Sequence, residues 1–304
     1  MKGIIMNKKS INKDDIVFDC INNVIMIIIL LIVLYPLYFI LIASVSDPDA
    51  VSLGKVVLLP KTIDFAGYLR VFHSKRIWLG YYNTIIYTVF GTILSVFLTI
   101  TAAYPLSQKK LSIKKPLMIF FTIPMFFSGG IVATYLVVKS LGMVNTPSAI
   151  LVLGSVTMWN IVIARTFIQT TIPAEISEAA EVDGCSNFRY FFQILLPLSK
   201  AIIAVEALFY GVGHWNDFFK ALIYINSQQL KPLQLILSEL LSSLEVSNEM
   251  QQLVDNVYDI NEMSKIAGLM KYCIIVVASA PLLAVYPFLQ KYFVQGVMIG
   301  SLKG

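Results

Sequence analysis

The sequence predicts an all-α membrane protein with six transmembrane helices, and two observations lead to this fold class. The first is composition: of 304 residues, 57% are hydrophobic and 13% are charged, and the mean hydropathy is +0.76. A soluble domain has about 25% charged residues, so this chain has too few to cover a globule with polar surface. The second is a series of apolar stretches of about 20 residues, the length that crosses a bilayer. They lie at about 24–43, 80–106, 116–138, 147–167, 200–222 and 271–289.

These stretches divide the chain into an N-terminal segment 1–23, a six-helix domain 24–290 and a tail 291–304. The first stretch is longer than the apolar core of a signal peptide, so we expect it to be retained. Two mixed polar loops, 44–79 and 223–270, are expected on the outer side. A polar interruption, 172–197, separates the fourth and fifth stretches.

Basic residues in the short loops orient the chain, because cytoplasmic loops carry an excess of lysine and arginine. Four lysines follow the second stretch, whereas the connection after the third has only Lys139. The four are Lys109, Lys110, Lys114 and Lys115. Six crossings put both termini on one side. We therefore expect the termini, the lysine loop and segment 172–197 in the cytoplasm. The formal charge of +5 is scattered through loops, which indicates membrane orientation and no nucleic-acid partner.

The polar interruption has the pattern of two short helices. Pro173 suits the first turn of a helix, and Gly184 suits a left-handed residue that ends it. Between them, Ile176, Ala179 and Ala180 are expected on one face, with glutamates on the other. Ser186 can cap a second helix, which a proline, Pro197, is expected to end. A polar helix pair with a small-residue face indicates a docking element.

The spacing of Glu178-Ala179-Ala180, Gly184, Ile194 and Leu196-Pro197 resembles the EAA loop of the membrane subunits of bacterial ABC importers. In that family the loop is cytoplasmic and forms a coupling helix in a cleft of the ATPase subunit. Cys185 is a departure, because the family usually has alanine there. The resemblance implies that seven residues couple this chain to an ATPase: Glu178, Ala179, Ala180, Asp183, Gly184, Leu196 and Pro197.

The resemblance extends over essentially the whole chain. Segments 127–130, 215–217, 231–234 and 292–304 are similar to the maltose-type carbohydrate permeases, most of all to their complex oligosaccharide or polysaccharide branch. Ala133 departs from that branch, which often has proline there. This similarity implies the type I ABC importer permease fold. It also implies that the tail contacts the ATPase, through Gln295, Gly296, Gly300 and Lys303.

Two polar or flexible sites are candidates for the substrate path. Trp215 offers a stacking face for a sugar ring, and Asn216 and Asp217 offer hydrogen bonds to hydroxyls; a polar cluster at the membrane interface is the alternative. Gly129 and Gly130 are candidates for a bend that lines the path, although glycine is in any case common in membrane helices. Glu206 and His214 are ionisable groups within the fifth stretch, where such groups are functional candidates.

The resemblance implies a permease subunit of an ATP-driven oligosaccharide importer in a bacterial cytoplasmic membrane. Its implied partners are a second homologous permease, two copies of a cytoplasmic ABC ATPase and an extracellular solute-binding protein. ATP and Mg would bind to the ATPase and no cofactor to this chain, because the sequence has no phosphate-binding loop. The outer loop 223–270 contains an amphipathic pattern that could face the binding protein or lie on the membrane surface.

Three other functions remain open at this point. One is the same fold with a non-sugar cargo such as a peptide, an amino acid or phosphate. Another is a polytopic membrane enzyme, which would need a cluster of intramembrane carboxylates or histidines, and the chain has two histidines. A third is a secondary transporter, which should show an internal repeat. The three cysteines are far apart and show no C-x-x-C spacing, so no metal site is expected.

Overall fold

The structure is a computed structural model that describes residues 13–108, 110–252, 269–284 and 287. Regular structure in these residues is helical, with an isolated bridge between Ser46 and Ile63. The chain divides into two compact units, each described by itself. The first contains the described residues up to Arg70 and those of 269–276. The second contains the described residues from Val71 to Gln252 and from Val277 on.

The first unit is built on α1 (Lys13–Ser44), whose apolar side chains are exposed along most of its length. α2 (Pro48–Ser52) and α3 (Ala66–His73) follow. The described part of a helix over 269–284 packs on the end of α1, where the Cys273 thiol donates to the Ser44 carbonyl at 3.3 Å. α3 also lies close to this helix at Gly67, because a Cβ at that residue would lie 2.7 Å from the Cys273 sulfur.

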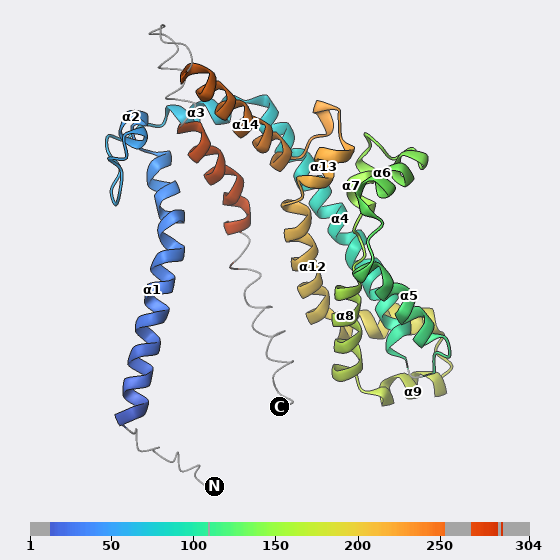
Figure 1. Ribbon diagram of the computed structural model, residues 1–304. Coiled ribbons are helices and arrows are strands. Elements are labelled where there is room, and N and C mark those ends of the chain that lie inside the picture. Colours follow the sequence, from blue (N-terminus) through green and yellow to red (C-terminus); the bar gives the residue numbers. More distant parts are fainter. Residues whose placement is uncertain (1–12, 109, 253–268, 285–286, 288–304) are drawn as a thin grey trace. The chain divides into compact units, whose positions relative to one another are not determined.

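The second unit is organised around α4 (Lys75–Ser107), a helix of 33 residues and about 50 Å. α8 (Met158–Thr171) and α12 (Lys200–Trp215) run along it (Figure 1). The other helices are α5 (Lys114–Phe126), α6 (Gly130–Ser140), α7 (Pro147–Val152), α9 (Ala174–Val182), α10 (Asn187–Tyr190), the π-helical turn η1 (Phe191–Leu195), α11 (Leu196–Leu198), α13 (Phe219–Tyr224), η2 (Gln228–Leu230) and α14 (Leu233–Gln252).

Two of the described helices are long and apolar enough to cross a membrane, α1 from Ile16 onward and α4. Two pairs of consecutive helices are long and apolar enough to cross only if each pair is taken as one bent span. The pair α5 and α6 bends by 115°, and the run 187–198 with α12 bends by 79°. Length and composition therefore support two to four crossings within the described residues, where the sequence predicts six. The sixth predicted stretch, 271–289, lies partly outside these residues.

The third predicted stretch breaks where its glycines stand. α5 ends at Phe126, and α6 begins at Gly130, which has a left-handed φ of +76°. Pro124 lies inside α5 rather than at the break. The glycine pair, and not the proline, thus coincides with the 115° bend.

The fourth predicted stretch, 147–167, is divided between two helices. α7 ends at Val152 and α8 begins at Met158, and Gly154 between them has a φ of +76°. Side chains from the α12–α13 region satisfy the interrupted backbone. Lys220 Nζ donates to the Leu153 carbonyl at 2.8 Å, and the Thr157 N–H donates to the Tyr210 hydroxyl at 3.3 Å. Irregular backbone at membrane depth is tolerated where protein groups pair with it in this way.

The fifth predicted stretch, 200–222, is also divided. α12 ends at Trp215, and α13 begins at Phe219. Asp217 occupies the break, where its carboxylate accepts from the Lys220 N–H at 3.2 Å and so helps to start α13. Polar capping groups inside the apolar stretch explain why it does not form one helix.

The amphipathic part of α14 packs against α4 instead of presenting its apolar face to a membrane surface. Leu233 and Ile236 are almost fully buried, and the Leu233 N–H donates to Thr84 Oγ1 at 2.8 Å. A Cβ on Gly80 would lie 2.8 Å from Ile236, so the small residue on α4 is needed for this approach.

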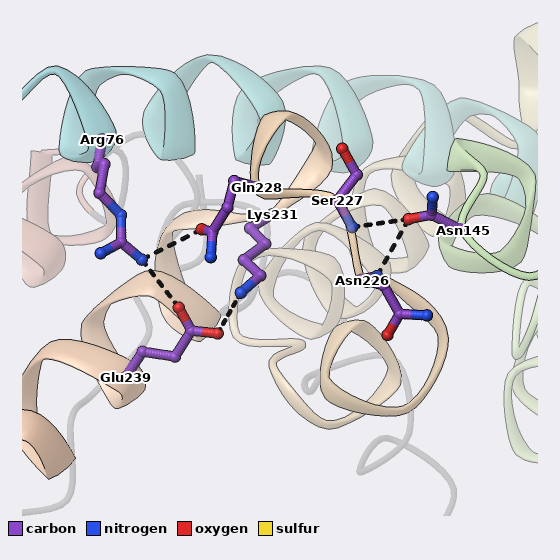
Figure 2. Close-up of polar contacts among 7 residues, drawn as sticks. All are labelled: Arg76, Asn145, Asn226, Ser227, Gln228, Lys231 and Glu239. Atoms are coloured by element: carbon purple, nitrogen blue, oxygen red, sulfur yellow. Dashed lines mark hydrogen bonds and ion pairs between the residues drawn. The ribbon is translucent and has the colours of Figure 1, made fainter.

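Polar side chains also attach α14 and the segment before η2 to neighbouring parts of the chain (Figure 2). Glu239 on α14 pairs with Arg76 on α4 at 3.0 Å and also with Lys231. Arg76 additionally donates to Gln228 at 3.2 Å. The Asn145 side chain accepts from two N–H groups of the segment before η2, at 3.0 and 2.8 Å. These contacts fix α14 to the start of α4, and its leading loop to the connection between α6 and α7.

Candidate functional site

The first half of segment 172–197 forms the helix that its sequence predicts. α9 follows Pro173, has Asp183 as its C-terminal cap and ends at Gly184, which has a φ of +71°. The Gly184 N–H donates to the Glu181 carbonyl at 3.1 Å, and the Cys185 N–H donates to the Ala180 carbonyl at 2.9 Å. This pair of bonds is the Schellman motif, which requires a left-handed residue at the position of Gly184.

The second half of the segment begins at the predicted residue but does not end at the predicted one. Ser186 caps α10 as expected, because its Oγ accepts from the Arg189 N–H at 3.3 Å. The expectation that Pro197 ends the helix was wrong, since the helical run continues to Leu198. The π-helical turn η1 shifts the hydrogen-bond register so that Pro197 stands in the first turn of α11. A missing N–H is tolerated at that position.

One face of this segment belongs to the core of the second unit. Ala180 of α9 and Leu195 of η1 are buried in a cluster with residues of α4, α8 and α12. Ile176 packs against the cluster from α9. Figure 1 shows α9 lying across the end of α8. The segment is therefore joined to the ends of the long helices by side-chain packing.

The opposite face exposes apolar side chains outside that core. Val182 is 88% exposed and Phe188 is 81% exposed, and Ala179 is exposed as well. The three residues Ala179, Val182 and Phe188 are called the exposed loop face below. The expectation that Ala179 and Ala180 share one face was wrong, because Ala180 points into the core. Carboxylates surround the exposed loop face, from Glu175, Glu178, Glu181 and Asp183, all exposed.

Further contacts tie the segment and α8 to the end of α4. Arg165 Nε donates to the Leu106 carbonyl at 3.0 Å, and Gln169 Nε2 donates to the Ser107 carbonyl at 2.9 Å. These carbonyls lack partners within α4 because they belong to its last turn. Lys110 in the lysine loop pairs with Glu181 at 2.5 Å, and this hydrogen bond raises the pKa of Lys110.

The predicted substrate-path residues near the end of α12 contact other residues of the chain, although the Trp215 Nε1 has no hydrogen-bond partner among the described residues. Trp215 is 8% exposed, and its ring packs at 6.3 Å from that of Tyr81. Asn216 Nδ2 donates to the Val212 carbonyl at 3.0 Å. Asp217 pairs with Lys220 at 2.5 Å. In this conformation Trp215 has no open face for a sugar ring.

A cavity of about 440 Å³ lies next to these residues, at the ends of α8 and α12 away from α9. Its lining comes from the break before α8, from α8, from α12 and from the start of α13. The lining residues are Gly154, Thr157, Trp159, Asn160, Phe209, Tyr210, Gly213, His214, Asp217 and Lys220. Of the predicted path residues, Asp217 reaches it. Sequence reasoning missed Trp159 and Asn160, whose signal is a Trp-Asn pair in the first turn after Thr157, the residue that caps α8.

The buried ionisable groups of α12 lie on its side toward α4. His214 Nε2 is 3.3 Å from Ser95 Oγ, and the Tyr210 hydroxyl is 2.7 Å from Thr99 Oγ1. Glu206 is fully buried, and neither of its oxygens has a hydrogen-bond partner among the described residues. No cluster of potential metal ligands occurs in that part of the chain either.

The remaining predicted site residues are not brought together with this cavity. Gly129 and Gly130 are exposed at the bend between α5 and α6. The tail residues Gln295, Gly296, Gly300 and Lys303 lie outside the described residues, as does Lys109.

The second unit is thus a group of apolar helices that holds an exposed, capped helix pair at one end. The family described as "Binding-protein-dependent transport system inner membrane component" matches residues 77–299. The chain belongs to this family.

Two relatives from Bacillus subtilis (strain 168) match over nearly their full length. "Protein LplC" is 39% identical over 292 residues, which cover 95% of each chain. "Polygalacturonan/rhamnogalacturonan transport system permease protein YtcP" is 35% identical, covering 94% of this chain and 98% of the relative. One solved structure, a bacterial ABC transporter "involved in the import of the acidic polysaccharide alginate", has a chain that matches with a TM-score of 0.83 and 30% identity, covering 93% of this chain and 98% of that one.

Family membership settles the general role. The chain is an inner-membrane component of a transport system, a transport subunit and not an enzyme. A system of this family works with a solute-binding protein and, in ABC transporters, with an ATPase.

Proposed function

We propose that this chain is a permease subunit of an ATP-driven importer of oligosaccharides derived from polysaccharides. The observation that carries the coupling role is the capped helix pair of segment 172–197, one face of which is buried among α4, α8 and α12 while the other is exposed. The cargo is supported by the names of two similar proteins, which refer to polygalacturonan or rhamnogalacturonan and to alginate.

The proposed mechanism is alternating access driven from the cytoplasmic side. ATP binding closes the partner ATPase, and the exposed loop face moves with it. Because Ala180 and Leu195 are packed against α4 and α8, and Arg165 is bonded to the end of α4, the movement reaches the long helices instead of being absorbed in a loop. The bends at Gly129-Gly130 and around Gly154 are where the helices can change direction.

The proposed topology has six spans over 24–290, with segment 1–23, the coupling loop 172–197 and the tail 291–304 in the cytoplasm. Loops 44–79 and 223–270 are then on the outer side. The lysines between the second and third stretches support this orientation. The broken helix pairs α5–α6, α7–α8 and α12–α13 would each complete one crossing together with the connecting backbone.

The proposed assembly contains a second homologous permease, two copies of the ATPase and an extracellular solute-binding protein. ATP and Mg would be bound by the ATPase, because this sequence has no phosphate-binding loop. The tail, through Gln295, Gly296, Gly300 and Lys303, is proposed as a second ATPase contact.

Co-purification from membranes tests the coupling role. A tagged chain should recover an ATPase, and Phe188→Asp should abolish that recovery, because it puts a charge on an apolar side chain that is 81% exposed and outside the core. Phe65→Asp is the matched control, since Phe65 is 56% exposed and lies in a proposed outer loop; it should leave recovery unchanged.

Uptake of labelled oligosaccharides by a deletion strain, complemented with each variant, gives the second readout. Phe188→Asp should lose uptake while it remains in the membrane at the wild-type level. Normal uptake and normal ATPase recovery with Phe188→Asp would contradict the proposed coupling face.

A further inference from the structure

The cavity at the ends of α8 and α12 has the composition of a small ligand site. Its volume of about 440 Å³ lies within the range of about 300–1,000 Å³ that is usual for such sites. Its lining combines aromatic and polar side chains. It is separated from the coupling loop by the length of α8, which begins at the cavity and ends next to α9.

Two aromatic side chains of the lining are exposed. Trp159 is 62% exposed, and Phe209 is 40% exposed. Trp159 stands in the first turn of α8, directly after the break at Gly154–Thr157. Its indole therefore offers what the buried ring of Trp215 does not, an open flat face with a polar N–H at one edge.

An unpaired amide lies beside these rings. Asn160 is 7% exposed and lines the cavity, and its side chain has no hydrogen-bond partner among the described residues. A ligand in the cavity that supplies hydroxyl groups could form hydrogen bonds with this amide. The amide can donate and accept at once, which suits hydroxyls.

The charged groups of the lining are already neutralised. Lys220 is paired with Asp217 at 2.5 Å and also donates to the Leu153 carbonyl. No uncompensated charge therefore attracts an ion into the cavity from the described residues. An open aromatic face, an amide in the lining and balanced charge together favour a ring that is apolar on its faces and hydroxylated at its edges.

We propose that this cavity is a saccharide subsite of the transport path, in which Trp159 stacks on a sugar ring and Asn160 bonds to its hydroxyls. The subsite rests on the proposed function and adds to it a defined place of contact in this subunit. It also moves the stacking role from Trp215 to Trp159.

Three substitutions of Trp159 distinguish the effect of an aromatic ring from the effect of side-chain size. The complete transporter is reconstituted in vesicles with its binding protein, and the import of radiolabelled neutral oligosaccharides is measured beside that of oligogalacturonides. Trp159→Ala and Trp159→Leu should each lower the import rate about tenfold, which corresponds to about 1.4 kcal/mol. Trp159→Phe should keep at least about half of it, because a ring that can stack remains.

Two controls show that the effect belongs to the cavity. Trp78→Ala, at an indole that is 55% exposed on α4 but outside the lining, should leave import unchanged. Asn160→Leu should lower import, whereas Asn160→Ser, which retains a hydroxyl that donates and accepts, should lower it less. ATP hydrolysis without binding protein should be the same in Trp78→Ala as in the wild type.

The outcomes distinguish this subsite from the proposed function. If the wild-type complex imports an oligosaccharide and Trp159→Leu imports it at the same rate, the subsite is overturned and the function stands. Equal losses in Trp159→Phe and Trp159→Ala would also overturn stacking. If the wild-type complex imports none of these oligosaccharides, the proposed cargo fails and the subsite with it.

Discussion

Gly184 sets the end of the coupling helix through its backbone conformation and not through its small size. Its φ is +71°, and an added Cβ would meet no atom within 4 Å. A side chain therefore finds room, but a left-handed backbone costs about 1–2 kcal/mol for most L-residues. Asparagine is tolerated there much better than valine, because branching at Cβ makes φ > 0 especially unfavourable.

This difference gives a prediction at the residue scale. Gly184→Val should impair ATP-driven uptake, whereas Gly184→Asn should retain most of it. Gly142→Val is the matched control, since Gly142 has a φ of +68° and equally open surroundings but lies outside the coupling loop. The measurement is the uptake rate, compared at equal amounts of each variant in the membrane. If Gly184→Val and Gly142→Val behave alike, the loop geometry has no special part in coupling.

Single residues also show where sequence reasoning succeeds. The limits of α9, the left-handed Gly184 and the Ser186 cap follow from local chemistry and are confirmed. Which of two adjacent residues is buried cannot be predicted from local chemistry, because it depends on what packs against the helix. Ala180 is in the core and Ala179 is exposed, a difference that the EAA spacing leaves undetermined.

At the scale of elements, α14 is attached to α4 by a partly buried charge cluster. Glu239 pairs with both Arg76 and Lys231, and the Lys231 side chain is only 10% exposed. Glu239→Gln should lower stability by about 1–3 kcal/mol, since it leaves a largely buried ammonium group without a counter-charge. The measurement is the thermal unfolding midpoint of the purified chain.

Glu181→Gln is the matched control for that substitution. The Lys110–Glu181 pair is at least two-thirds exposed on both sides, and water screens such pairs, so its loss should leave the midpoint unchanged. Equal shifts for the two variants would mean that burial at Lys231 does not decide the energy of the cluster.

Elements also show why the sequence overestimates continuous helices. The stretch 147–167 is apolar enough to read as one span, but Gly154 breaks it and Lys220 and Tyr210 bond to the freed backbone. Those partners come from more than 50 residues further along the chain, so no local pattern shows them. For the same reason no local pattern shows that Arg165 caps the end of α4.

At the scale of the molecule, the second unit places its two candidate sites at opposite ends of α8 and α12. The exposed loop face lies beyond the end of α8, and the saccharide cavity lies at its start. Helices that are packed and capped at one end can transmit a displacement to the other. This arrangement suits a permease in which the motor and the cargo never meet.

The central claim is that segment 172–197 is a cytoplasmic docking element, and site-directed labelling tests it most directly. Phe188→Cys is made in a chain in which Cys20, Cys185 and Cys273 are replaced, and it is exposed to a membrane-impermeant maleimide. Leu58→Cys, 64% exposed in a proposed outer loop, is the control. The account predicts labelling of position 58 in intact cells and of position 188 only in inside-out vesicles, with protection by bound ATPase. Labelling of position 188 in intact cells would contradict it.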